Sequence, residues 1–152
     1  MSDPVADPAT HTLGSGSFDA ASTGFATGAL PTVTVTDNRN PTLGGWTVAV
    51  GATQFKSATN QAGTTTPLHT IAGSNVSYWS GAATVASGTV VAAGQQLAET
   101  GAVTLSQSRD AVVATGAVGN NSVTFTPSLK VNISGVPVDT YTGVITHSVT
   151  GS

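Results

Sequence analysis

The sequence predicts an all-β fold, an antiparallel β-sandwich of Ig-like or jelly-roll-like type with about nine to eleven short strands. Valines alternate with threonines from Thr32 to Thr36, which is the period of a strand with one buried face, and similar alternation recurs along the chain. Turn-forming glycine, proline and asparagine separate the apolar runs at a spacing typical of a sandwich. No helical period competes, and we find no fixed internal repeat of the kind that a β-solenoid requires.

A chain of 152 residues is long enough to bury the core of one domain. We divide it into an N-terminal arm over residues 1–12 and a single β-sandwich domain over residues 13–152. The arm carries Pro4 and Pro8, which lack the N–H that a sheet ladder requires. The arm can therefore lie on a sheet edge but cannot form a central strand.

The first half of the domain is expected to alternate short strands with polar loops. Strands are predicted over residues 10–19, 31–37, 45–56, 76–79 and 83–91, with a short strand or turn around 67–72, a Gly/Ala/Ser/Thr segment at 20–30 and a polar loop at 57–66. Phe25 and Leu30 are the expected anchors of the segment at 20–30.

The second half is expected to hold a single helical turn at 95–99 and then strands over residues 101–106, 110–118, 122–126, 129–133 and 140–150. Residues 119–122 read as a tight hairpin turn, because glycine and asparagine tolerate positive φ. The last strand places alternate residues on one face: Tyr141, Gly143, Ile145, His147 and Val149.

Charge is sparse, since only 7% of the residues are charged and the net charge is −3. Binding to phosphates or to anionic lipid requires several cations on one surface, so we expect neither nucleic-acid binding nor membrane insertion. The absence of cysteine excludes a disulfide framework. Such a neutral, threonine-rich chain suits an extracellular, cell-surface β-protein. No signal peptide is visible, so an exported form would have lost it, and a virion component that is never exported is the alternative.

We expect no catalytic residues, no metal and no cofactor. The sequence contains no pattern of a nucleophile elbow, a metalloprotease helix or a phosphate-binding loop. The histidines His11, His69 and His147 are not at metal-ligand spacing.

Aromatic residues and His147 are the candidate binding groups. Tyr78 and Trp79 are adjacent, so in a strand one ring faces the core and the other faces solvent, where it could stack on a sugar. Trp46 follows glycine and opens a strand, which favours a place in the core over a ligand platform.

A polar turn precedes Trp46. Asp37 and Arg39 fall on the face of the valines in the strand at 31–37, and Gly44 and Gly45 mark the turn that follows. We expect a structural turn in which Asp37 accepts turn N–H groups and pairs with Arg39.

These residues also carry a resemblance to a known family. Asp37-Asn38-Arg39 and Gly45-Trp46-Thr47-Val48 resemble the first motif of the WxL domain, a surface domain of Gram-positive bacteria. Val136-Pro137 and the run Thr140-Tyr141-Thr142-Gly143 with the residues that follow it to Val149 are similar to its second motif. Val48 replaces a leucine of the family, and His147 stands where the family typically has tryptophan. The resemblance covers residues 31–56 and 123–149.

The resemblance implies a non-enzymatic extracellular domain that associates with a cell-wall polymer or with other surface proteins. One alternative is a self-assembling structural subunit of an extracellular fibre or virion, in which residues 1–12 add a strand to a neighbouring copy. Another is a carbohydrate-binding module that uses Tyr78 or Trp79.

Overall fold

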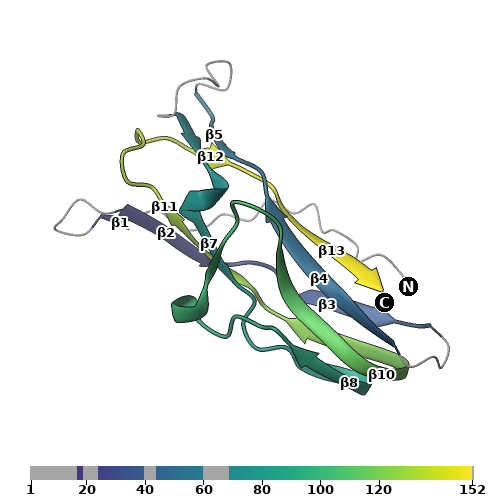
Figure 1. Ribbon diagram of the computed structural model, residues 1–152. Coiled ribbons are helices and arrows are strands. Elements are labelled where there is room, and N and C mark those ends of the chain that lie inside the picture. The colour runs from purple at the N-terminus through teal and green to yellow at the C-terminus, as the bar shows by residue number, and fades with distance from the viewer. Residues whose placement is uncertain (1–16, 19–23, 40–43, 60–68, 152) are drawn as a thin grey trace.

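The computed structural model describes residues 17–18, 24–39, 44–59 and 69–151. They form an all-β sandwich, which confirms the predicted fold class, and every strand pair among them is antiparallel (Figure 1). The described residues hold 13 strands, several of only two residues, where about nine to eleven were predicted.

The strands form three sheets. The first has the order β1 (Ser17–Phe18), β2 (Gly24–Ala29), β11 (Ser128–Asn132), β7 (Val76–Trp79) and β9 (Val103–Thr104). The second contains β13 (Ile145–Gly151), β4 (Gly44–Ala52), β10 (Arg109–Phe125), β3 (Val33–Asp37) and β8 (Thr84–Ala93). The third consists of β12 (Tyr141–Thr142), β5 (Phe55–Ser57) and β6 (Thr70–Ile71). Two single 3₁₀ turns, η2 (Gly73–Asn75) and η3 (Glu99–Gly101), complete the described elements.

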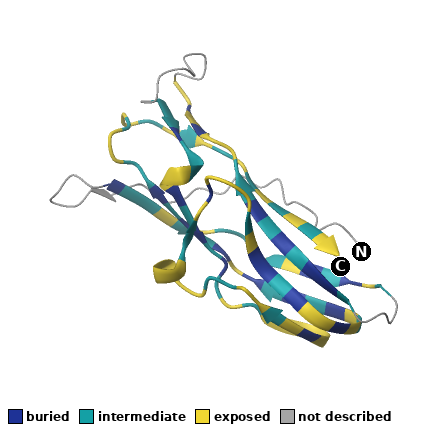
Figure 2. Cartoon of the chain, viewed as in Figure 1, coloured by how far each residue is buried: buried dark blue, intermediate teal, exposed yellow. Residues whose placement is uncertain are grey.

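Side chains from the first and second sheets meet in one core. Trp46, Val48 and Val50 of β4 are at most 1% exposed, and the residues between them are more exposed, as the alternating colours of Figure 2 show. Tyr78 of β7 and Leu129 of β11 belong to the same buried cluster. Full burial of one such aliphatic side chain stabilises a fold by roughly 1.5–3 kcal/mol, so the period of two in the sequence is what selects the sandwich.

The long strand β10 organises the second sheet. Along one edge it pairs with β8, from Val113 opposite Ala93 to Thr124 opposite Thr84. Along its other edge it pairs first with β4 and then with β3. The two strands β3 and β4 therefore follow one another on the same edge, and their junction lies opposite the middle of β10.

The middle of β10 forms a corner, where the strand turns back with β8 beside it (Figure 1). Gly116 and Gly119 of β10 have φ of 62° and 64°, and Gly88 of β8 has φ of 77°. The register between β8 and β10 shifts across this region. Bulges with left-handed glycines bend a strand, so these three glycines produce the corner.

Alanine substitutions at Gly88 and Gly119 form a matched pair that tests the corner. A Cβ at Gly88 would lie 2.2 Å from the Asn120 carbonyl oxygen, whereas a Cβ at Gly119 meets no atom within 4 Å. Gly119→Ala should cost only the strain of a left-handed residue, about 1–2 kcal/mol. We expect Gly88→Ala to lower the free energy of unfolding further, as measured by urea denaturation. Equal losses in the two variants would contradict the close approach of β8 and β10.

Two predictions for the second half of the chain are wrong. Residues 119–122 do not form a hairpin turn, because β10 continues through them with β8 on one edge and β3 on the other. The predicted helical turn at 95–99 is also absent from the described structure, and η3 begins only at Glu99. The Gln96 backbone is held instead by Ser80 and Gly81: its N–H donates to Ser80 Oγ at 3.1 Å, and its carbonyl accepts from the Gly81 N–H at 3.0 Å.

Some strand boundaries also differ from those predicted. The strand expected at 45–56 divides into β4 and β5, and the strand at 140–150 divides into β12 and β13. The two breaks face one another, since the Thr53 hydroxyl accepts a hydrogen bond from the Val144 N–H at 2.9 Å. The segment at 20–30, for which no strand was predicted, contains β2. The arm at 1–12, most of the strand at 10–19 and most of the loop at 57–66 lie outside the described residues.

Candidate functional site

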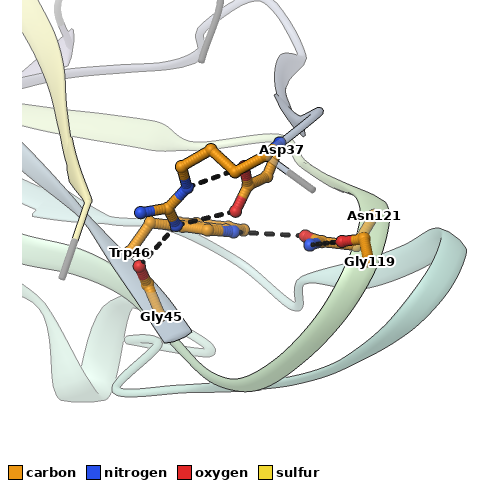
Figure 3. Close-up of polar contacts among 6 residues, drawn as sticks. Asp37, Gly45, Trp46, Gly119 and Asn121 are labelled. Atoms are coloured by element: carbon orange, nitrogen blue, oxygen red, sulfur yellow. Dashed lines mark hydrogen bonds and ion pairs between the residues drawn. The ribbon is translucent and has the colours of Figure 1, made fainter. Parts of the chain in front are cut away.

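Asp37, Arg39 and Gly45, which we call the polar bracket, join the end of β3 to the start of β4 (Figure 3). The Arg39 guanidinium donates to both carboxylate oxygens of Asp37, from Nε to Oδ1 at 2.9 Å and from Nη2 to Oδ2 at 2.7 Å. Arg39 Nη2 also donates to the Gly45 carbonyl oxygen at 2.8 Å. The predicted Asp37–Arg39 pair is confirmed. The prediction that Gly44 and Gly45 mark the turn is wrong, because both already belong to β4, and Gly44 pairs with β10.

The bracket contains an ionised carboxylate that is almost completely buried. Asp37 is 3% exposed, while the Arg39 side chain keeps 35% of its surface exposed. Hydrogen bonds from Arg39 lower the pKa of Asp37 and outweigh the opposing effect of burial, and the same contact raises the pKa of Arg39. Asp37 is therefore charged at neutral pH, and its geometry suits a structural link rather than proton transfer.

Trp46 lies inside the corner of β10 with its one polar atom paired. Its indole N–H donates to Asn121 Oδ1 at 3.2 Å, and the Asn121 amide donates to the Gly119 carbonyl at 3.2 Å (Figure 3). Trp46 and Asn121 are each 1% exposed. The expected place of Trp46 in the core is confirmed, and this ring has almost no surface to offer a ligand.

The two segments that carry the WxL resemblance are neighbours in space. The strand β13 pairs with β4, with Val149 opposite Val48 and Gly151 opposite Trp46. A Cβ at Gly151 would lie 2.5 Å from Arg39 Nη1, so the guanidinium packs closely against the end of β13. The bracket, the start of β4 and β13 thus form one structural unit.

Tyr78 and His147 connect the two large sheets. The Tyr78 hydroxyl and His147 Nε2 are 3.0 Å apart, and the Phe125 ring lies edge-on to the imidazole at 6.0 Å between centroids. Tyr78 has no exposed surface, and burial raises its pKa. Burial lowers the pKa of His147 to about 4, so the imidazole is neutral at pH 7.

The lowered pKa of His147 predicts an acid-sensitive contribution to stability. The unfolded chain takes up a proton at this residue near pH 6.5, and the folded chain only near pH 4. Below about pH 6.5, protonation of His147 favours the unfolded chain. The free energy of unfolding is therefore unaffected by His147 above about pH 6.5 and falls as the pH decreases toward about 4. We expect the melting temperature to decline in this window for the natural chain but to stay nearly level for His147→Gln, which cannot titrate. Parallel declines in the two proteins would contradict the assignment to His147.

Trp79 differs from Tyr78, its neighbour in β7. It is partly exposed, so one ring of the pair faces the core and the other is turned outward, as predicted. Of the candidate rings Trp46, Tyr78 and Trp79, only Trp79 is not fully buried and could stack on a sugar. Trp79 pairs with Ser128 of β11 in the first sheet, whereas the polar bracket belongs to the second sheet. The structure therefore brings Tyr78 and His147 together but does not gather all four predicted binding residues into one site.

A shallow groove of about 470 Å³ lies beside the junction of β4 and β10. Its lining residues are Gly44, Gly45, Trp46, Thr47, Val113, Ala114, Thr115 and Gly116. None of them is charged, and Thr47 and Thr115 supply hydroxyl groups. This lining suits an uncharged ligand that accepts and donates hydrogen bonds.

The sequence did not reveal a polar cluster around Asp139. This carboxylate accepts hydrogen bonds from the hydroxyls of Ser57 and Thr59 and from the Thr140 N–H at 2.7 Å. The hydrogen bond from Ser57 is the main reason why the pKa of Asp139 lies well below its usual range. The cluster joins β5 to the segment before β12. No local pattern could have found it, because Ser57 and Asp139 are 82 positions apart.

Over the described ranges, no three His, Cys, Asp or Glu side chains are grouped so that they could hold a metal ion. No helix in the same ranges is long and apolar enough to cross a membrane.

Comparison of the chain with protein-family models, with curated proteins and with solved structures finds no match in any of the three. The resemblance to the WxL domain stays a prediction that rests on the motif residues.

Proposed function

We propose that this chain is a non-enzymatic, extracellular domain that associates with a cell-wall polymer at a bacterial surface. The observation that carries the proposal is the pairing of β4 with β13, which brings the two motif segments together. Asp37 and Arg39 pair at the same place, where Arg39 donates to the carbonyl of Gly45, the residue before Trp46, and packs against Gly151 at the end of β13. Two segments that resembled the family only by chance would have no reason to be neighbours. Segments of a domain that shares the fold of the family would be expected to pair.

The buried motif residues define the fold, so the contact with the polymer belongs to the outer surface. The shallow groove lined by residues of the paired strands β4 and β10 offers hydroxyls and small apolar groups without a charge. A neutral glycan can hydrogen-bond to such a lining, and little of the affinity would come from ion pairs. Binding should therefore be nearly independent of salt concentration.

Co-sedimentation with purified Gram-positive peptidoglycan tests the proposal. We expect the folded protein to sediment with the wall material at both low and high salt, and to remain in solution with insoluble cellulose. Thr115→Lys places a charged side chain in the groove and should abolish sedimentation, whereas Thr34→Lys adds the same charge at an exposed position of β3 and should not. A folded protein that remains in the supernatant with peptidoglycan at all concentrations would overturn the proposal.

A structural subunit of a fibre or virion is the second candidate. The observation in its favour is the edge of β13 that faces away from β4. No described strand pairs with that edge, and β13 carries no Lys, Arg, Asp or Glu. Charged residues are a common protection of edge strands against pairing with another chain. Negative-stain microscopy distinguishes this candidate, because it predicts long regular polymers. The predicted donor of the added strand, residues 1–12, lies outside the described residues.

A further inference from the structure

We propose that β13 is a dimerisation edge, through which two copies of this chain pair antiparallel about a two-fold axis at Ser148. The dimer would join the second sheets of both copies into one continuous sheet. Such a dimer does not require binding to the cell wall.

The backbone of β13 can hydrogen-bond to a further strand. The Thr53 N–H donates to the Val144 carbonyl at 2.9 Å, and β13 pairs with β4 in the same register through all seven of its residues. Because antiparallel residues alternate between bonded and non-bonded pairs, Thr146, Ser148 and Thr150 exchange hydrogen bonds with β4. The backbone N–H and C=O groups of the four residues between and beside them point away from β4, toward the other edge of β13. These residues are Ile145, His147, Val149 and Gly151. In the described part of the chain, no strand pairs with that edge.

The core-facing side of β13 is also incompletely covered. Ile145, His147 and Val149 turn toward the core, yet each keeps part of its surface exposed. In the adjacent strand β4, Val48 and Val50 are 0% exposed. A strand added beside β13 would cover this remaining apolar surface, so backbone pairing and burial favour the same contact.

The other long free edge among the described strands is less suitable. The strand β8 has ten residues, but Gly88 and the register shifts against β10 break its line. Bulges of this kind hinder pairing with another chain. The strand β13 has no such irregularity.

A second copy is the occupant that the sequence of β13 favours. A two-fold axis sets each residue against the same short sequence, and like charges directly opposite one another are destabilising. The uncharged segment Ile145–Gly151 carries no such penalty. An axis at Ser148 sets Ile145 against Gly151 and His147 against Val149, so that all four outward-directed residues pair. An axis at either neighbouring residue would leave some of them unpaired.

Single-cysteine variants test the register directly, because the natural chain has no cysteine. The two copies of residue 148 would form a non-hydrogen-bonded pair with Cα atoms about 4.5 Å apart, within disulfide range. The two copies of residue 146 would be about 14 Å apart. Under mild oxidation of the full chain, we expect Ser148→Cys to form a covalent dimer and Thr146→Cys to stay monomeric. A mixture of Thr146→Cys and Thr150→Cys should form the mixed dimer.

The non-covalent dimer gives a second readout by light scattering and amide exchange. We expect a concentration-dependent dimer that Ser148→Lys weakens several-fold, because two lysines would then face each other, and that Thr34→Lys leaves unchanged. The amides of His147 and Val149 should become protected only on dimerisation, while those of Thr146 and Ser148 are protected throughout. A monomer at every concentration, equal cross-linking at positions 146 and 148, or dimerisation only after deletion of residues 1–16 would each overturn the proposal. The last result would assign the edge to the chain's own N-terminal segment.

Discussion

Trp46→Ala should lower the free energy of unfolding by about 3–5 kcal/mol, the loss that is typical when a large buried aromatic is truncated. Trp46 is 1% exposed and fills the inside of the corner where β4 and β10 meet. The substitution also leaves the Asn121 Oδ1 atom, which accepts from the indole, without its partner. Many domains are stable by only about 5–15 kcal/mol, so the variant should lose a large part of its total stability.

Trp46→Phe separates the two parts of this effect. Phenylalanine keeps most of the apolar volume but cannot donate to Asn121. The free energy of unfolding of Trp46→Phe should therefore lie between those of the natural chain and Trp46→Ala. Urea denaturation of the three proteins measures both steps. If Trp46→Ala melts within a few degrees of the natural chain, the tryptophan does not support the core.

Arg39→Ala should give the second large loss of stability. It leaves the Asp37 carboxylate, whose side chain is 4% exposed, without its cation. Removing one member of a buried pair typically costs about 3–5 kcal/mol, and an exposed pair contributes about 0–1 kcal/mol. Because the Arg39 side chain is about one-third exposed, we expect a loss between these two ranges.

A double-mutant cycle attributes the loss to the pair. Asp37→Ala together with Arg39→Ala should be less destabilised than the sum of the single variants, because no unpaired charge remains. Arg39→Lys keeps the charge but cannot donate to both Asp37 oxygens and Gly45 in the same geometry, so it should restore only part of the stability. Additive single effects would show that the bracket is not a coupled unit.

The sequence predicted the parts of the fold that depend on local pattern. Alternation in β3, β4 and β13 identified the strands and their buried faces, because a period of two and a one-sided core are direct consequences of strand geometry. The Asp37–Arg39 pair was also predictable, since its members are two positions apart and end a recognisable strand.

The corner of β10 was not predictable in this way. Glycine and asparagine at 119–121 are compatible with both a hairpin turn and a bulge, and the choice depends on the distant strands β3 and β8. Asn121 had no sequence signal for burial, because its partner Trp46 is 75 positions away. The Asp139 cluster was missed for the same reason. Contacts between distant segments determine where the buried polar residues of this fold lie.

The emission of Trp46 tests most directly the claim that the motif residues are structural and buried. The chain has two tryptophans, so Trp79→Phe leaves Trp46 as the only one. Because the Trp46 indole is 1% exposed, we expect blue-shifted emission from the folded variant, poor quenching by acrylamide, and a red shift on unfolding. Emission at the wavelength of free tryptophan with efficient quenching in the folded protein would contradict it and would make Trp46 a surface contact for a ligand.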